Sequence, residues 1–389
     1  MALNRKRQMA IFVTVVFTVY SLANLYIYLK GRRALTGAGL PVALYTAVFI
    51  ILASAFIAGK VLEYSHSSVF TDILNIIGGF WMAFMLYGFL IWLTADILLL
   101  LQKPFHLVPV ASLPKLRLWL FITVTSVTVL LIIMGFINAI TPVTKRYDLD
   151  IDKSFSDGRD SIRVVAVSDI HLGSIIRKRS MRQLSHMINE EKPDVVLFLG
   201  DLLDGSIGPV LRDDLLSYLS LDESPYGKFA ITGNHEYMSD RGKALPYIEG
   251  KGIRVLMDEV VTLGNGLQLA GRKDRSAIRL PGDDGRMSLD KLLSQCDTTA
   301  PLIVMDHQPF ELSSLAETAV DIQLSGHTHN GQIWPLTIIT NRMFELSYGM
   351  KRFGKATVIV SSGFGIWGPR MRIGTRPEIL SICLHGRSE

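Results

Sequence analysis

The sequence predicts an α/β protein in two parts, an N-terminal bundle of four transmembrane helices followed by a layered α/β domain. Three observations support this fold class. Four long apolar segments precede residue 141, short apolar runs alternate with amphipathic stretches after residue 161, and polar residues follow several of those runs. The chain of 389 residues is long enough for two or three units of ordinary domain size.

Composition separates the two parts. The mean hydropathy is +0.32 and only 19% of the residues are charged, which is unusual for a soluble protein of this size. A split near Thr141 separates an apolar part from one with ordinary globular composition. The net charge of +5 is modest and no long basic run is interleaved with aromatic residues, so we expect no nucleic-acid partner. Cys296 and Cys383 are far apart in sequence and are interpreted as ordinary thiols.

The four apolar segments, at about 9–29, 40–62, 73–101 and 118–140, are each long enough to cross a lipid bilayer as a helix. The first follows Arg5-Lys6-Arg7, as a signal peptide would, but it is too long and lacks an Ala-x-Ala-like exit, which favours a retained helix. Asp96 lies inside the third segment. It marks either a polar site within the bundle or, as we prefer, a residue near the interface that bonds a neighbouring helix.

These segments assign residues 1–141 to the transmembrane region, 142–160 to a polar linker and 161–389 to the globular domain. The lipid bilayer is therefore a predicted partner. Lysine and arginine residues are equally frequent at the two ends of the helices, so the positive-inside rule leaves the membrane orientation open.

In the globular part, apolar runs with β-branched residues predict strands, and a 3.6-residue apolar spacing predicts helices at 181–191 and 211–219. Glycine-rich residues 264–285 are expected to form hairpins and loops. The expected strands are 162–168, 194–199, 228–232, 302–305, 322–325, 357–361 and 378–383.

Polar motifs follow five of these strands. Ligands collect at the carboxyl ends of strands in open sheets, so we expect the motifs to converge in space. Five of the nine histidines belong to them. The motifs are Asp169-x-His171, Gly200-Asp201, Gly233-Asn234-His235-Glu236, Asp306-His307 and Gly326-His327-Thr328-His329.

Aspartate, histidine and asparagine without thiolates form a ligand set that suits Mn, Fe, Zn or Co rather than Cu(I) or an iron–sulfur cluster. A carboxylate between two motifs can bridge two ions, and a pair of ions can clamp a displacement at phosphorus. Asp201 is the natural bridge. Glycines at 200, 233 and 326 allow the backbone to turn sharply at the strand ends.

This ordered set of motifs resembles the calcineurin-like metallophosphoesterase superfamily. The longer strings at 233–237, 306–309 and 326–333 are similar to its membrane-associated bacterial branch, related to the YkuE and YaeI phosphoesterases. The resemblance covers residues 161 to the C-terminus and implies a four-layer αββα metallophosphoesterase domain. Asn330 departs from the pattern, because relatives often have glycine there.

The resemblance also implies roles for individual residues. Asp169, His171, Asp201 and His329 would hold one divalent metal ion. Asn234, His307 and His327 would hold a second ion together with Asp201. Mn²⁺ is favoured, with Fe, Zn or Co as alternatives, and His235 would donate a proton to the leaving oxygen.

Several further residues keep two interpretations. Arg370 and Arg372 either bind a substrate phosphate or form solvated or ion-paired side chains. Glu236 either orients His235 or, as we prefer, caps a helix. Trp334 and Trp367 either line an apolar substrate groove or, as we prefer, pack.

Together these features predict a membrane-anchored, dinuclear metal-dependent phosphoesterase that hydrolyses phosphate ester or pyrophosphate bonds with metal-activated water. The expected substrate is phosphorylated and lipid-linked. Alternatives are a UDP-2,3-diacylglucosamine pyrophosphatase of lipid A synthesis, a non-catalytic membrane receptor or scaffold with a metal-binding domain, and a transporter with an enzymatic appendage. The expected location is a bacterial cytoplasmic membrane, as a multi-pass protein. The side of the catalytic domain and the oligomeric state stay open.

Overall fold

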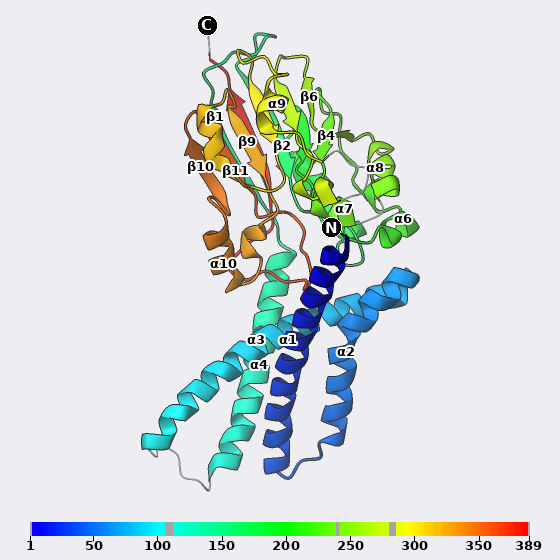
Figure 1. Ribbon diagram of the computed structural model, residues 1–389, viewed down its shortest axis with the longest axis vertical. Coiled ribbons are helices and arrows are strands. Elements are labelled where there is room, and N and C mark those ends of the chain that lie inside the picture. Colours follow the sequence, from blue (N-terminus) through cyan, green and yellow to red (C-terminus); the bar gives the residue numbers. More distant parts are fainter. Residues whose placement is uncertain (1, 106–111, 239–240, 280–284, 388–389) are drawn as a thin grey trace. The chain divides into compact units, whose positions relative to one another are not determined.

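The computed structural model describes residues 2–105, 112–238, 241–279 and 285–387 (Figure 1). The chain divides into two compact units, Met1–Met134 and Gly135–Glu389. The first is helical, whereas the second contains all the described strands and begins with the last turn of a helix.

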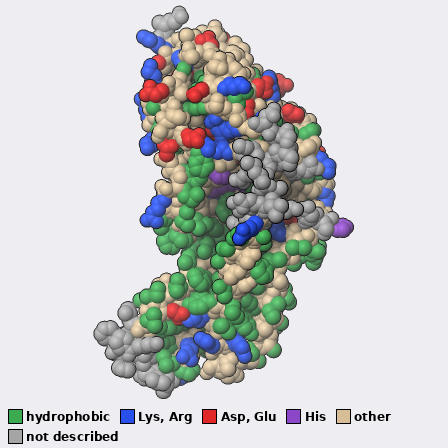
Figure 2. Space-filling view, in the orientation of Figure 1, with side chains coloured by type: hydrophobic (Ala, Val, Ile, Leu, Met, Phe, Trp, Pro, Cys, Tyr) green, Lys and Arg blue, Asp and Glu red, His purple; other side chains and the backbone are tan. Residues whose placement is uncertain are grey.

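Four long helices form the first unit: α1 (Ala2–Gly37), α2 (Ala43–Ser65), α3 (Val69–Phe105) and α4 (Leu113–Ala139), whose last turn belongs to the second unit. Within the described residues, these four helices are long and apolar enough to cross a membrane. Hydrophobic side chains such as Ile51 and Trp119 are exposed on them. Figure 2 shows many hydrophobic side chains on the surface of these helices. The predicted set of four apolar helices is confirmed.

Polar contacts join the helices of the first unit. Asp96 of α3 forms an ion pair with Lys30 of α1 and accepts a hydrogen bond of 2.6 Å from the Tyr26 hydroxyl. Asp96 therefore bonds a neighbouring helix, which is the second of the two interpretations given above.

The second unit contains two six-stranded sheets (Figure 1). In spatial order, the first consists of β1 (Val143–Asp150), β12 (Glu378–His385), β2 (Ser161–Val167), β3 (Val195–Phe198), β4 (Lys228–Ile231) and β5 (Arg254–Leu256). The second consists of β10 (Gly349–Phe353), β11 (Ala356–Val360), β9 (Ile322–Ser325), β8 (Leu302–Met305), β7 (Gln268–Gly271) and β6 (Glu259–Thr262).

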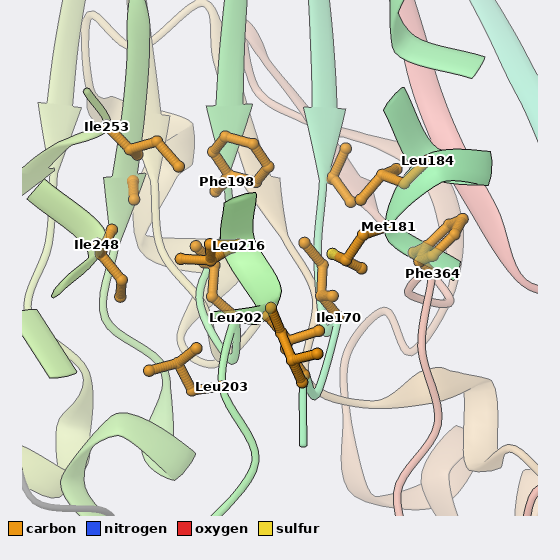
Figure 3. Packing of buried hydrophobic residues seen from close by; sticks show 14 of the residues in the cluster. Ile170, Met181, Leu184, Phe198, Leu202, Leu203, Leu216, Ile248, Ile253 and Phe364 are labelled. Atoms are coloured by element: carbon orange, nitrogen blue, oxygen red, sulfur yellow. The ribbon is translucent and has the colours of Figure 1, made fainter. Parts of the chain in front are cut away.

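Alternation along the strands creates the layers. In β2, Val164 and Ala166 belong to the core between the sheets, whereas Val165 and Val167 pack with Met181 and Leu184 of α5 (Lys178–Glu190). Figure 3 shows this outer cluster, with the α5 side chains lying over the sheet. Each fully buried aliphatic side chain contributes about 1.5–3 kcal/mol of transfer free energy.

The outer face of the second sheet is covered in the same way. Val304 and Val358 pack against Leu292 of α9 (Leu289–Leu293) and Leu315 of the 3₁₀ helix η4 (Leu312–Glu317). Helical layers therefore cover both sheets, and the predicted αββα fold is confirmed.

The remaining helices are short and lie in the connections. They are α6 (Gly208–Asp213), η2 (Leu215–Tyr218), α7 (Asn234–Met238), α8 (Arg241–Glu249), η3 (Arg275–Arg279), η5 (His329–Gly331) and α10 (Leu336–Met343).

The helix expected at 211–219 is replaced by α6 and η2. Asp214 breaks it with a left-handed backbone (φ 43°). Its carboxylate accepts hydrogen bonds from the Tyr247 hydroxyl at 2.8 Å and from the Lys251 ammonium at 2.9 Å. Aspartate tolerates this conformation better than most residues, and these tertiary bonds are absent from the local apolar spacing.

Residues 143–150, which were expected to belong to the polar linker, form strand β1. It pairs in parallel with β12, from Val143 opposite Glu378 to Asp150 opposite His385. The strand lies at the sheet edge, where several side chains stay in solvent, so its polar composition resembles that of a linker. Residues 264–285 supply the turn and the second strand of the β6–β7 hairpin and the loops that follow, while 280–284 lie outside the described residues.

We predict that amide hydrogens of 144–149 exchange more slowly than those of 157–160, because β1 bonds to β12 whereas 157–160 contain no strand. Hydrogen–deuterium exchange of the detergent-solubilised full chain measures this. Equally fast exchange in both segments would show that 143–150 is a flexible linker.

Candidate metal centre

Seven polar side chains meet at the carboxyl ends of strands from both sheets. Strands β2, β3 and β4 are parallel neighbours in the first sheet, as are β8 and β9 in the second. Their carboxyl ends therefore lie at a common edge of each sheet. Asp169 and His171 follow β2, Asp201 follows β3, Asn234 follows β4, His307 follows β8, and His327 and His329 follow β9.

One group consists of Asp169, His171 and His329, whose ligand atoms all lie within 4.8 Å of one another. His329 Nε2 lies 3.2 Å from Asp169 Oδ1 and 3.0 Å from His171 Nε2. All three side chains are buried. Two imidazole nitrogens and a carboxylate oxygen thus face a common point.

A second group consists of Asp201, His307 and His327, again with ligand atoms within 4.8 Å of one another. Asp201 Oδ2 lies 3.1 Å from His307 Nε2 and 3.9 Å from His171 Nε2 of the first group. Asp201 therefore lies between the groups. His307 Nδ1 lies 2.7 Å from the Leu199 carbonyl, an arrangement in which Nδ1–H donates and Nε2 keeps its lone pair.

Backbone strain is concentrated at this centre. Asp169, His171, Asp201, His327 and His329 all have positive φ angles, from 48° to 69°. Such conformations cost about 1–3 kcal/mol each and persist only where surrounding contacts enforce them. These five backbone conformations therefore lower the stability of the fold, and they direct the five side chains toward the common centre.

Glu236 holds two of the ligand loops. Its buried carboxylate accepts hydrogen bonds from the backbone N–H groups of Gly233 at 2.7 Å, Asp201 at 3.0 Å and Leu203 at 3.0 Å. The bond to Gly233 is the helix-capping contact preferred above, since Glu236 is the third residue of α7. The hydrogen bonds from Asp201 and Leu203 connect the same carboxylate to the loop after β3. Burial, followed by the negative charge of Asp201, raises the pKa of Glu236 to about 7.

His235 lies beside the first group with its ring 4.5 Å from the ring of His171. Its Nδ1 lies 3.2 Å from Asp204 Oδ1, and its backbone N–H donates to Asp201 Oδ1 at 2.8 Å. Asp204 is a site residue that the sequence reasoning missed. Its position three residues after Asp201 in the same strand-end loop was the available signal.

Burial and nearby carboxylates together set the protonation of the histidines. Burial lowers the pKa of His171 to about 3 and that of His327 to about 4, so both rings are neutral near pH 7 and carry a free lone pair. Asp201 outweighs burial at His307 and raises the pKa of that ring well above its ordinary value. Burial also opposes the charge on His235. The Asp204 hydrogen bond and the Asp201 charge outweigh it and raise the pKa of His235 to about 9. His235 is therefore protonated near pH 7.

A cleft of about 340 Å³ opens over the centre. Figure 2 shows histidine side chains recessed beside hydrophobic ones. One wall is polar and carries His235 and ligand-group residues. The apolar part of the lining, here called the apolar wall, consists of Leu336, Ile339, Met343, Phe344 and Trp367.

Neither Arg370 nor Arg372 lines this cleft. Arg372 is fully buried, and its Nη2 donates to the carbonyls of Gly363 at 2.9 Å and Gly365 at 2.6 Å and lies 3.3 Å from His329 Nδ1. The interpretation of Arg372 as a phosphate contact is wrong, because its guanidinium is committed to the protein interior. Arg370 stacks on Phe136 at 5.6 Å. Of the two tryptophans, only Trp367 lines the cleft.

Comparison with known proteins agrees with this geometry. The family model described as "Calcineurin-like phosphoesterase" matches residues 162–331. An uncharacterized metallophosphoesterase of Aquifex aeolicus is 34% identical over 230 residues, which cover 58% of this chain and 86% of that protein. The chain belongs to the calcineurin-like metallophosphoesterase family.

Two further relatives bear on the predicted resemblance. A zebrafish (Danio rerio) protein called "Transmembrane protein with metallophosphoesterase domain" is 33% identical over 271 residues, covering 66% of this chain and 61% of that protein. The metallophosphoesterase YkuE of Bacillus subtilis is 28% identical over 240 residues, covering 58% and 80%. The resemblance to metallophosphoesterases related to YkuE is confirmed.

The residues present fit the metal ions that this family's name implies. The donor set of carboxylates, imidazoles and one amide contains no thiolate. Asn234 Oδ1 is buried and has no hydrogen-bond partner among the described residues, which leaves it available as a ligand. Buried acceptors gathered at one point are otherwise costly, and a cation compensates them.

We predict that Gly326→Ala disrupts the centre. A Cβ at Gly326 would lie 1.7 Å from Ser168 Oγ and 2.4 Å from Asp169 Oδ2, so the ligand loop must shift. Metal affinity and phosphoesterase activity should both fall. Gly205→Ala is the matched control, since its Cβ meets nothing within 4 Å. Equal metal affinity in the two variants would contradict the close approach of Gly326 to Ser168 and Asp169.

We also predict that Asp204→Asn lowers the turnover number without reducing metal affinity, because Asp204 contacts His235 and lies outside the seven proposed ligands. The loss should be smaller than that caused by His235→Ala. Steady-state kinetics and metal titration measure the two effects, with exposed Asp222→Asn as control. An unchanged turnover number in Asp204→Asn would show that Asp204 does not position His235.

Proposed function

We propose that this protein is a membrane-anchored, dinuclear metal-dependent phosphoesterase that acts on an amphiphilic, lipid-linked phosphate ester or pyrophosphate. The observation that carries the proposal is the pair of buried ligand groups with Asp201 between them, at the floor of a cleft that has one polar and one apolar wall.

The first ion would be held by Asp169, His171, Asp201 and His329, and the second by Asp201, Asn234, His307 and His327. We propose Mn²⁺, with Fe, Zn or Co as alternatives that the same donors accept. When bound, the two ions supply an activated water and neutralise charge on the transferring phosphoryl group.

His235 is the proposed proton donor. It lines the cleft, it is protonated near pH 7, and its Nδ1 is engaged by Asp204, so Nε2 remains to protonate the leaving oxygen. Glu236 keeps the loops after β3 and β4 in register by bonding three backbone N–H groups. A scaffold that only binds metal would need the ligand loops that Glu236 holds, but it would not need a protonated His235 in the cleft.

The apolar wall supports an amphiphilic substrate. A phosphate at the polar wall would place the attached group against Leu336, Met343 and Phe344, where an acyl chain is buried favourably. Four helices able to cross a membrane support a multi-pass protein of a bacterial cytoplasmic membrane. UDP-2,3-diacylglucosamine is one candidate substrate with the required chemistry.

The test is hydrolysis by the detergent-solubilised full chain with Mn²⁺, using bis(p-nitrophenyl) phosphate and UDP-2,3-diacylglucosamine. We expect turnover that chelation abolishes and Mn²⁺ restores. Asp201→Asn should abolish metal-dependent activity. His235→Ala should lower the turnover number about 10²- to 10⁴-fold. His186→Ala, at an exposed histidine, is the control.

Each outcome has a distinct meaning. Cleavage of the lipid nucleotide would support the amphiphilic substrate, whereas cleavage of the soluble diester alone would keep the phosphoesterase and discard that candidate. Metal binding without turnover of any phosphate ester would overturn the enzymatic proposal in favour of a receptor or scaffold.

A further inference from the structure

An uncovered apolar surface lies at the mouth of the cleft. It consists of Trp334, Ile338, Ile339, Met343 and Trp367, here called the apolar ridge. These side chains are 42–62% exposed. They account for five of the nine large hydrophobic side chains that are exposed among the described residues of the second unit.

Helix α10, which carries most of the ridge, buries no residue against its own unit. Isolated helices of this length are marginal in water, and exposed apolar patches of this kind are typical of interaction sites. The ridge therefore needs a partner that is itself apolar.

The chain connects the ridge directly to the end of a candidate membrane span. Asn138, in the last turn of α4, donates to the carbonyls of Arg372 at 2.9 Å and Thr375 at 2.7 Å. The intervening Ile373 accepts a hydrogen bond of 2.9 Å from the N–H of Trp334. The apolar stretch of α4 continues to Ala139. One short segment, 372–375, thus contacts both the end of α4 and the start of the ridge.

We propose that the apolar ridge inserts into the headgroup–acyl boundary of the bilayer that α4 crosses. Tryptophan is the residue type enriched at that depth, and a helix with one apolar face lies in the plane of the interface. Arg342 is exposed in the last turn of α10, where its positive charge would attract anionic lipid headgroups. The partner is lipid rather than a second protein, because the anchor that adjoins the ridge is itself a candidate membrane helix.

The ridge is continuous with the apolar wall of the cleft, since Ile339, Met343 and Trp367 belong to both. A lipid-linked phosphate would therefore pass from the bilayer to the histidines without its acyl chain crossing water. This substrate route rests on the proposed function, whereas the contact between ridge and bilayer does not.

Spin labelling of the full chain in phosphatidylcholine–phosphatidylglycerol liposomes tests the contact. In a Cys296→Ser, Cys383→Ser background, a nitroxide is attached at Ile338→Cys or at the exposed control position Ser294→Cys. We expect the Ile338→Cys label to collide more with oxygen than with an aqueous nickel chelate, and the Ser294→Cys label to show the reverse. Nickel accessibility at Ile338→Cys equal to that at the control would overturn the proposal. Spectral broadening that disappears on dilution with unlabelled protein would also overturn it, because a second copy would then cover the ridge.

Turnover provides a second, separable readout. Ile338 does not line the cleft. Ile338→Glu should therefore leave hydrolysis of the soluble diester unchanged and lower turnover of vesicle-embedded UDP-2,3-diacylglucosamine about tenfold, as expected for losing one buried aliphatic side chain. Equal turnover of the vesicle substrate by both proteins would reject the route. If the wild-type chain hydrolysed neither substrate, the proposed function would be wrong. The accessibility of the spin label at Ile338→Cys would still test whether the ridge contacts the bilayer.

Discussion

Two buried carboxylates, Asp169 and Asp201, hold the ligand loops of both sheets together. Asp169, from the first sheet, accepts the backbone N–H of His327 from the second at 2.9 Å. Asp201 accepts that of His235 at 2.8 Å. Burying an ionised carboxylate costs several kcal/mol unless it is fully compensated, so the loops must bring donors and imidazoles to both charges. The left-handed backbone at five ligand positions is a consequence of that requirement.

The gathering of the seven polar side chains was predictable because it depends on local signals and one topological rule. Each motif follows an apolar run, and parallel neighbours bring strand ends to one edge. Asp204 was missed because its place in the loop after β3 is only a weak signal, and its contact with His235 depends on how two loops meet. The capping contact of Glu236 was visible locally. Its bonds to Asp201 and Leu203 depend on how two loops meet.

The errors in the fold have a similar origin. Strand β1 is stabilised by β12, more than two hundred residues later, while its own sequence is polar at the exposed edge. The break at Asp214 depends on Tyr247 and Lys251, which reach it from a later helix and the turn that follows. A phosphate contact was one of two interpretations of Arg372, because a guanidinium can bind a phosphate through two parallel hydrogen bonds. Its burial, which decides against that role, is a property of tertiary packing.

Arg372 also shows why the last turn of α4 belongs to the catalytic unit rather than to the membrane part alone. The backbone N–H of Arg372 donates to the Gly135 carbonyl at 2.9 Å, and its guanidinium lies 3.3 Å from His329 Nδ1. Asn138 holds the same segment through two carbonyls. A chain that began at residue 141 would leave these groups unpaired beside a proposed metal ligand, with a cost of about 1–3 kcal/mol for each buried one. The contacts that attach the last turn of α4 to residues 372–375 therefore also help to position His329.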